Sequence, residues 1–365
     1  MRPRAMFRTV VVAGVGLIGG SVALGTRQRF LADKVIGYDR DPGVLDAARG
    51  LGAIDEAQLA EGPWLEEADL LVLAAPARSV VALGAQLRGH LRPDAVVTDV
   101  ASVKGAVVDG MRAPRFVGGH PMAGSERGGI LNADAALLEN AVWALTPEEG
   151  VTDPAALSLV RAFVEGLGAR PIEVSPAQHD RLVATVSHLP YLAAVALTAL
   201  VDEGEERSLM MLLAAGGFRD LTRVASGDPV MSRDMVAGNR EAVRGALSAY
   251  RHRLEHLDAL LDDPDLLLAA GEAAKRTRDG IPIVRRGLLP ARHEVVLAVP
   301  DRPGELARIT NALGDANVNV KDIEVLSIRE AGGAIRLAFE TADELVRGAA
   351  SLRAAGYEVR SRNGG

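Results

Sequence analysis

The 365-residue sequence contains no cysteine, and aromatic residues make up only 3% of it. Without cysteine, the chain forms no disulfide, no thiolate metal site and no cysteine nucleophile, and we predict no metal site of another kind. No run approaches the roughly 18 apolar residues of a membrane span. No signal-peptide segment stands ahead of the first predicted strand. We therefore expect a cytoplasmic protein that contacts no membrane.

The net charge and the length of the chain further limit the class of protein and the number of domains. The net charge of −7 at pH 7 argues against general nucleic-acid binding. A chain of 365 residues exceeds a single ordinary core. From changes in pattern along the chain we expect four segments: a nucleotide-binding domain at 1–174, a helical domain at 175–280, a linker at 281–292 and a small domain at 293–365.

A glycine-rich turn organises the first domain. A buried β-branched strand is predicted at Val10–Ala13, directly before Gly14, Gly16 and Gly19. In a dinucleotide site the first glycine makes a tight turn, the second admits a pyrophosphate and the third lets a helix pack closely. The alternative is a glycine-rich turn in an ordinary α/β domain. We predict these cofactor-binding residues: Gly14, Gly16, Leu17, Ile18, Gly19, Asp39 and Ala75.

Asp39 indicates which dinucleotide binds. It ends the second predicted strand, twenty residues after Gly19, where a carboxylate accepts hydrogen bonds from an adenine-ribose diol. A carboxylate there repels a 2′-phosphate, which favours NAD over NADP. Arg40 follows directly and could soften this repulsion, so NADP stays open.

Further apolar strands alternate with helical patterns in the first domain. We predict strands at 69–76, 95–100, 116–119 and 142–145, and the alternation predicts a Rossmann-type, doubly wound parallel sheet. Ligands of such sheets bind at the carboxyl ends of the strands. The polar stretches expected there are the Gly14 turn, Ser102–Lys104 and His120-Pro121.

His120 is the candidate general base. It directly follows a predicted strand, and an unperturbed imidazole titrates near neutral pH, so it can take a proton as hydride leaves a substrate. Ser102, at the neighbouring strand end, could orient the ring by a hydrogen bond. The alternative is a structural histidine that caps the following turn.

The segment from Ala177 to about Ala274 contains no convincing strand. A helix is predicted at Leu182–Leu200, broken near Pro190. Arg219 and Arg223 are one helical turn apart and suit a carboxylate, although two surface arginines are the alternative. A heptad pattern follows, which predicts either packing within the domain or a homodimer interface; it consists of Val243, Leu247, Tyr250, Leu254, Leu257 and Leu261.

The last two segments differ sharply in pattern. Six basic residues lie in Lys275–Arg292, which we interpret as a solvated linker because interleaved aromatics are missing. From His293 onward the order of strands and helices is βαββαβ, which predicts a ferredoxin-like sheet. Its strands are expected at 294–299, 318–327, 334–339 and 357–360.

These motifs together resemble the prephenate dehydrogenase family, in members that carry a C-terminal ACT domain. The resemblance covers nearly the whole chain and rests on the Gly14 turn and on the following segments: Asp99–Lys104, Gly119–Glu126, His179-Asp180, Ser187–Pro190 and Gly217–Arg223. It implies that His120 contacts the ring hydroxyl and hydrogen-bonds Ser102, and that Arg223 binds the ring carboxylate. The other substrate-binding residues that it implies are Glu126, Ser187, His188, Tyr191 and Asp220.

The reaction implied is the NAD-dependent oxidative decarboxylation of prephenate to 4-hydroxyphenylpyruvate. Family members often have histidine where this chain has Tyr191, so arogenate remains an alternative substrate, with tyrosine as product. A β-hydroxyacid dehydrogenase would need a catalytic lysine in the first long helix, and Leu182–Leu200 contains none. A non-catalytic sensor of NAD and an amino acid is a second alternative.

The last domain resembles ACT domains, which usually pair edge to edge and bind an amino acid. The resemblance predicts tyrosine as an effector, with a purely structural dimerisation module as the alternative. The predicted effector-binding residues are Asp301, Arg302, Pro303, Gly304, Asn317 and Val318.

Overall fold

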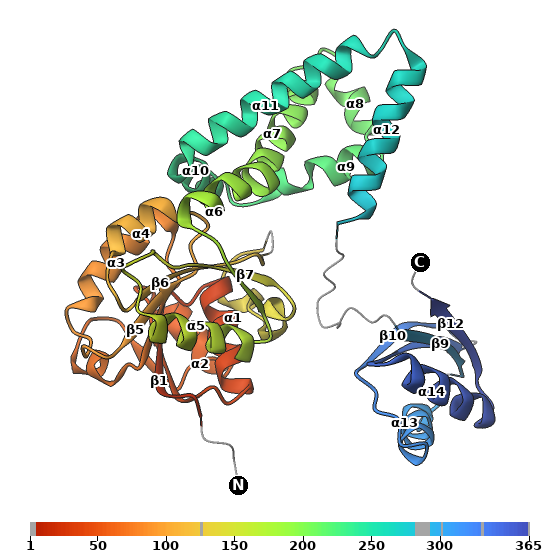
Figure 1. Cartoon of the computed structure of the whole chain (residues 1–365), viewed down its shortest axis with the longest axis horizontal. Helices are drawn as coiled ribbons and strands as arrows, with labels where there is room; N and C mark the ends of the chain where they lie inside the picture. Colours follow the sequence, from red (N-terminus) through yellow and green to blue (C-terminus); the bar gives the residue numbers. More distant parts are fainter. Residues whose placement is uncertain (1–4, 125–126, 282–292, 301, 330–331, 364–365) are drawn as a thin grey trace. The chain divides into compact units, whose positions relative to one another are not determined.

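The computed structural model describes residues 5–124, 127–281, 293–300, 302–329 and 332–363. The chain divides into two compact units, Met1–Pro282 and Ile283–Gly365, and each is described by itself. The first unit contains the nucleotide-binding sheet and the helical region, and the second contains the small C-terminal sheet (Figure 1).

The first unit is built on an eight-stranded sheet in the order β3-β2-β1-β4-β5-β6-β7-β8. This order confirms the doubly wound Rossmann-type fold. The strands are β1 (Phe7–Ala13), β2 (Ala32–Tyr38), β3 (Glu56–Gln58), β4 (Leu70–Leu73), β5 (Val96–Asp99), β6 (Phe116–Pro121), β7 (Val142–Thr146) and β8 (Arg170–Glu173).

One strand pair departs from the parallel sheet that the sequence predicts. The pairs from β3 to β6 are parallel, but β7 is antiparallel to β6, and β8 is parallel to β7. A parallel pair needs a crossover, usually a helix. The described residues between β6 and β7 form only two short 3₁₀ segments, Ile130–Asn132 and Ala135–Leu138. The chain therefore returns in the opposite direction.

Helices cover both faces of the sheet, and alternate strand residues face each layer. Val10 and Val12 pack toward α1 and α5, whereas Val11 and Ala13 pack toward α3 and α4. All four are fully buried, as expected of a central strand. The helices of this region are α1 (Leu17–Gln28), α2 (Pro42–Gly50), α3 (Ala77–Arg88), α4 (Gly105–Met111) and α5 (Pro154–Gly166).

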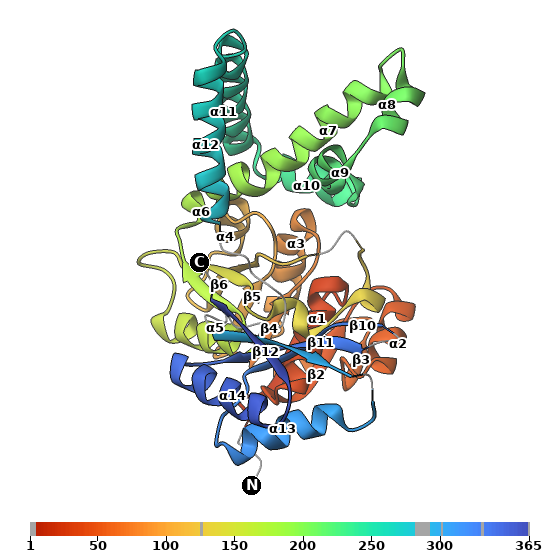
Figure 2. The ribbon, with the colours of Figure 1, turned by 90° about the vertical axis from the view of Figure 1, so that its right-hand side faces the viewer.

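Helices α6 to α12 lie together beyond α3 and α4 in both views (Figure 1 and Figure 2). The expected break near Pro190 is a π turn at Ala184–His188, just before it. Pro190 then lies in the first turn of α7, where no helical N–H is needed. The helices are α6 (Pro176–Val183), α7 (Leu189–Asp202), α8 (Arg207–Leu213), α9 (Gly216–Thr222), α10 (Pro229–Gly238), α11 (Arg240–Ala259) and α12 (Pro264–Asp279).

Two features of this region concern its exposed apolar surface. Contrary to expectation, the 27 residues Pro176–Asp202 contain an 18-residue window with a mean hydropathy of 1.6, and they are long and apolar enough to span a membrane by length and composition. Along α11, Val243 is buried, but Leu247 and Leu254 are 40% and 46% exposed. The heptad surface is therefore not covered by the described part of its own chain.

The second unit has the predicted ferredoxin-like order. Its sheet runs β10-β11-β9-β12 and is wholly antiparallel. The second strand begins at Asp322, later than expected, because Asn317 has a φ of +50° and Val318 N–H bonds back to Leu313, which ends α13. The elements are β9 (His293–Val299), α13 (Glu305–Asp315), β10 (Asp322–Arg329), β11 (Gly332–Phe339), α14 (Ala342–Ala354) and β12 (Glu358–Asn363).

Candidate active site

The glycine turn between β1 and α1 is shaped for close backbone approach. Gly14 has a φ of +95°, and a Cβ there would lie 2.6 Å from the carbonyl oxygen of Ala74. A Cβ on Gly19 would lie 1.9 Å from the carbonyl oxygen of Gly14, so α1 packs against the turn only with glycine. A Cβ on Gly16 would meet nothing within 4 Å. Gly16 thus faces open space at the N-terminus of α1, as a pyrophosphate site requires.

Asp39 lies beside this turn. Its Oδ2 accepts a hydrogen bond of 2.9 Å from Val15 N–H, and its Oδ1 accepts one of 3.1 Å from Asp41 N–H. These bonds hold the carboxylate against the glycine turn. A carboxylate has about four acceptor sites, so Asp39 keeps capacity for a ribose diol.

The other predicted cofactor residues surround the same turn. Leu17 and Ile18 form the first residues of α1 and are partly buried. Ala75 follows β4, and its N lies 3.0 Å from the position that a Cβ of Gly14 would take. The structure therefore brings all seven predicted cofactor residues to the carboxyl ends of β1, β2 and β4.

A buried ion pair supports the next strand end. The ammonium of Lys104 pairs with the carboxylate of Asp99, and both side chains are fully buried. Asp99 also accepts from Ala101 N–H at 2.9 Å and Gly119 N–H at 3.0 Å. Lys104 donates to the Gly119 carbonyl at 2.8 Å. Burial lowers the pKa of Lys104, and the charge of Asp99 opposes that effect. The pair ties the end of β5 to the strand that carries His120.

His120 belongs to a chain of three hydrogen-bonded polar side chains. Its Nδ1 lies 2.9 Å from Nε2 of His179, and Nδ1 of His179 lies 2.8 Å from Oδ1 of Asp180. His120 is partly buried at the end of β6, and His179 is buried within α6. The helical region thus supplies the hydrogen-bond partner of the candidate base.

Burial, nearby charge and hydrogen bonds set the pKa values of His120 and Asp180. Burial, followed by the positive charge of Lys104, holds the pKa of His120 well below the usual 6.5. His120 is therefore neutral near pH 7, as a proton acceptor must be. Burial alone would raise the pKa of Asp180. Hydrogen bonds from His179, Gly105 N–H and Lys104 N–H outweigh burial and lower it, so Asp180 stays ionised.

His188 lies next to this chain. It is fully buried, and Asn239 Nδ2 lies 3.3 Å from its Nδ1 while donating at 2.7 Å to the Asp180 carbonyl. Because the amide nitrogen only donates, His188 accepts at Nδ1 and carries its proton on Nε2. Burial lowers the pKa of His188 to about 4. Nε2 has no described partner, so it is a buried donor available to a ligand.

The remaining predicted site residues are less closely connected. Ser102 is partly buried after β5 and forms no hydrogen bond with a described residue, so the bond to His120 that the resemblance implies is absent here. Ser187 lies within the π turn and Tyr191 lies in the first turn of α7, and both are partly buried. Asp220 is exposed on α9. Arg219 is also on α9, but Arg223 begins a separate 3₁₀ turn. Glu126 lies outside the described residues.

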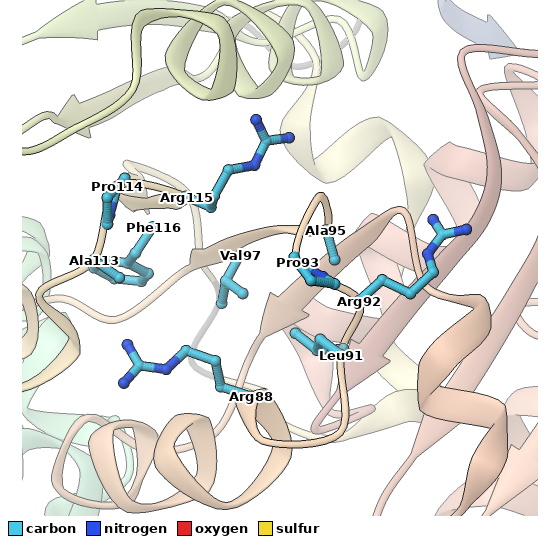
Figure 3. A pocket seen from close by; sticks show the side chains of 10 residues that line it. All are labelled: Arg88, Leu91, Arg92, Pro93, Ala95, Val97, Ala113, Pro114, Arg115 and Phe116. Carbon is cyan, nitrogen blue, oxygen red and sulfur yellow. The ribbon is translucent and has the colours of Figure 1, made fainter.

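A separate cavity of about 340 Å³ lies at the opposite edge of the sheet. Its lining includes Ala95 and Phe116, at the amino ends of β5 and β6 (Figure 3). The guanidinium groups of Arg88, Arg92 and Arg115 point away from one another, and they bond carbonyl or carboxylate oxygens outside the cavity. This cavity therefore does not belong to the site around His120.

The polar support of His120 was not predicted. The family motifs contain Asp99, Lys104, His179 and Asp180, but the sequence by itself indicates no role for them. A lysine four residues after the predicted apolar strand 95–100 and an adjacent histidine–aspartate pair were the available signals. Their pairing across 76 residues, from Lys104 N to Asp180, is visible only in the fold.

The predicted effector residues lie around α13. Gly304 has a φ of +88° and precedes the helix, and Arg302 is exposed beside it. Asn317 and Val318 follow the other end of the same 11-residue helix, about 16 Å away at 1.5 Å per residue. The expectation that Asn317 lies close to the Gly304 turn is therefore wrong within one chain. Asp301 lies outside the described residues.

Comparisons with known proteins agree over most of the chain. Residues 22–173 match the family model described as prephenate dehydrogenase, nucleotide-binding domain, and residues 175–267 match its dimerization domain. Residues 293–351 match the ACT domain model. The prephenate dehydrogenase of Bacillus subtilis (strain 168) is 32% identical over 96% of this chain and 97% of its own length.

Solved structures give the same result over about three quarters of the chain. Prephenate dehydrogenase from A. aeolicus, in complex with hydroxyphenyl propionate and NAD+, superposes with a TM-score of 0.72 at 34% identity, covering 76% of this chain and 99% of that one. Synechocystis arogenate dehydrogenase superposes with a TM-score of 0.66 at 34% identity, covering 74% and 99%.

Proposed function

This chain belongs to the prephenate dehydrogenase family and ends in an ACT domain, and from that premise we propose that it converts prephenate to 4-hydroxyphenylpyruvate in tyrosine biosynthesis. It is an NAD-dependent oxidoreductase. The observation that carries the proposal is a neutral His120 at the carboxyl end of β6, held by a histidine from the helical region. It lies at the same edge of the sheet as the glycine turn that follows β1.

The residues present fit a bound dinucleotide. Gly16 faces open space at the N-terminus of α1, and Asp39 lies beside the turn. We propose that the N–H groups at the start of α1 hold the pyrophosphate and that Asp39 accepts from the ribose diol. When bound, NAD+ supplies the acceptor for the hydride on the ring carbon that bears the hydroxyl.

In this reaction His120 accepts the proton of the substrate hydroxyl and later returns it. As the C–H bond breaks, Nε2 takes the proton of the hydroxyl and a ketone begins to form. The bond to the ring carboxylate then breaks, its electron pair enters the ring, and carbon dioxide leaves. The oxygen becomes that of a phenol and takes the proton back from His120. Hydride and carbon dioxide leave, and no net proton is released.

Arg223 is the proposed partner of the ring carboxylate, by its match to the family motif. A guanidinium can hold a carboxylate through two parallel hydrogen bonds. Binding that favours the ground state alone would not raise kcat, so Arg223 is expected to act mainly on substrate affinity. Ser187, His188, Tyr191, Asp220 and Glu126 complete the proposed substrate site.

The experiment that tests this function is an absorbance assay for NADH. Prephenate and arogenate are each supplied with NAD+ and with NADP+. The proposal predicts the fastest reduction with prephenate and NAD+. Faster turnover of arogenate would support the alternative, which the similarity to an arogenate dehydrogenase favours. Binding of both ligands without turnover would reject an enzymatic function.

The assembly and its control are part of the same proposal. The family model for residues 175–267 describes a dimerization domain, which supports a homodimer. We propose that a second copy covers the exposed heptad surface of α11 and the apolar face of α7, so that Pro176–Asp202 is not a membrane span and the enzyme is cytoplasmic. We further propose that tyrosine binds the ACT domain and inhibits the enzyme.

A further inference from the structure

The chain Asp180–His179–His120 determines where each imidazole proton lies. A carboxylate without a proton can only accept, so the 2.8 Å contact with Asp180 requires a proton on Nδ1 of His179. When the ring of His179 carries this one proton, its Nε2 is bare. The 2.9 Å contact with His120 needs one proton between the two nitrogens, and that proton must come from Nδ1 of His120.

We infer that His179 and Asp180 form a positioning pair that fixes the tautomer of His120, so that Nδ1 carries the proton and Nε2 is left bare as the proton acceptor. This inference rests on the proposed role of His120 as the base. Nε2 of His120 forms no hydrogen bond with a described residue. It is therefore the ring nitrogen that remains free for a substrate hydroxyl.

The pair also suits the charge that develops during the reaction. When Nε2 takes a proton, His120 becomes a cation and Nδ1 keeps its bond to His179. The nearest anion along the chain is the carboxylate of Asp180, which stabilises this cation across the His179 ring. Lys104 acts in the opposite sense, since its charge disfavours a protonated His120. The base is thus kept neutral at rest and supported once charged.

Asp180 is itself held rigidly. Its Oδ1 and Oδ2 accept hydrogen bonds of 2.8 Å each from Lys104 N–H and Gly105 N–H at the start of α4. Asn239 donates to the carbonyl of the same residue. The carboxylate therefore positions His179 and at the same time joins α6 to the nucleotide-binding domain. A correctly oriented base depends on this contact between the two regions.

The direct test is nuclear magnetic resonance of the full-length enzyme with ¹⁵N-labelled histidine and NAD+ bound. A bare imidazole nitrogen resonates well downfield of a protonated one. The chain has seven histidines, and His120→Asn identifies the signals of His120. We expect a protonated Nδ1 and a bare Nε2 at pH 7. A protonated Nε2 would overturn the inference, because His179 would then carry both of its protons.

Two substitutions at His179 provide a kinetic test. In His179→Asn the amide takes the place of Nδ1 and still reaches Asp180, but His120 loses its acceptor. In His179→Gln the longer side chain offers an oxygen where Nε2 was. We expect His179→Asn to lower kcat by roughly 10–100-fold, less than loss of the base itself, with KM nearly unchanged. His179→Gln should retain most of the rate.

The controls separate this inference from the proposed function. His90→Asn makes the same change at an exposed histidine after α3 and should have no effect. Equal rates for His179→Asn and the parent enzyme would reject the positioning role. If His120→Asn itself kept its full rate, the proposed base would be wrong, while the resonance measurement would still decide the tautomer.

Discussion

The ammonium of Lys104 donates a hydrogen bond of 2.8 Å to the carbonyl oxygen of Gly119, the residue before His120. This contact places a buried positive charge close to the candidate base. Burial is the larger cause that keeps this imidazole neutral, and the lysine charge adds to it, because a second positive charge there would be repelled in a region of low dielectric constant. The same lysine pairs with Asp99, so the support is connected to the core of the sheet.

The first prediction concerns His120. Replacement by asparagine removes the proton acceptor and keeps a polar group of similar size. We expect kcat to fall by roughly 10²–10⁴-fold, the usual contribution of a general base, and substrate binding to remain nearly intact. Steady-state NADH production measures both. A kcat within a few-fold of the parent enzyme would place the base elsewhere.

The second prediction concerns Arg223. Arg223→Ala should chiefly raise KM for prephenate, since loss of a charge-assisted pair to a carboxylate costs about 2 kcal/mol or more. Arg219→Ala is the matched control, because both residues are exposed and close in sequence. The assay is the dependence of rate on prephenate concentration. An unchanged KM in Arg223→Ala would rule out this assignment.

The third prediction concerns Asp39. Asp39→Ala should weaken NAD+ and improve NADP+ relative to it, because Arg40 is then free to face a 2′-phosphate. Asp39→Asn is the control: its amide oxygen can still accept from Val15 N–H, so it separates the charge from the support of the turn. Binding of both nucleotides is measured by fluorescence titration. A preference for NADP+ in the parent enzyme would contradict the argument.

The fourth prediction links His188 to stability. Its pKa is about 4 in the folded protein and 6.5 ordinarily, so below pH 6.5 the unfolded chain binds a proton that the folded chain does not. Its stabilising contribution is complete above pH 6.5 and is lost as the pH falls toward 4. The loss is roughly 3 kcal/mol in the free energy of unfolding.

Urea unfolding at pH 7 and pH 4.5 measures this effect. His188→Asn keeps an acceptor for Asn239 and removes the titrating ring, so its stability should change less between the two pH values. All other titrating groups are shared, and the difference between the proteins isolates His188. An equal pH dependence in both would show that the buried ring does not make this contribution.

The fifth prediction concerns the ACT domain. Tyrosine should inhibit the full-length enzyme with cooperative kinetics, because an effector acts only by binding two states unequally. A shortened chain ending at Leu289 lacks all but the first seven residues of the second compact unit. It should keep dehydrogenase activity but lose the cooperativity. Inhibition curves of the two proteins at equal prephenate decide the matter. Coincident curves would indicate inhibition at the active site instead.

The effector site illustrates the limit of sequence spacing. Gly304 and Asn317 are 13 positions apart, and both belong to motifs typical of ACT domains. The helix between them places them at opposite ends of α13. A single chain therefore does not bring the two halves of the predicted site together, and only the geometry of the folded domain shows this.

Local pattern by itself determined the nucleotide-binding turn, the succession of strands and helices along the chain after it, and the ferredoxin-like sheet. These depend on residues close in sequence: Gly14, Gly16 and Gly19 act within one turn, and alternation or helical periodicity acts within one element. Tertiary structure alone decided that β7 runs antiparallel to β6 and that His179, 59 residues after His120, is its hydrogen-bond partner. The reason is physical: a hydrogen bond or a strand pair between distant residues depends on where the whole chain packs, and no short-range pattern records that position.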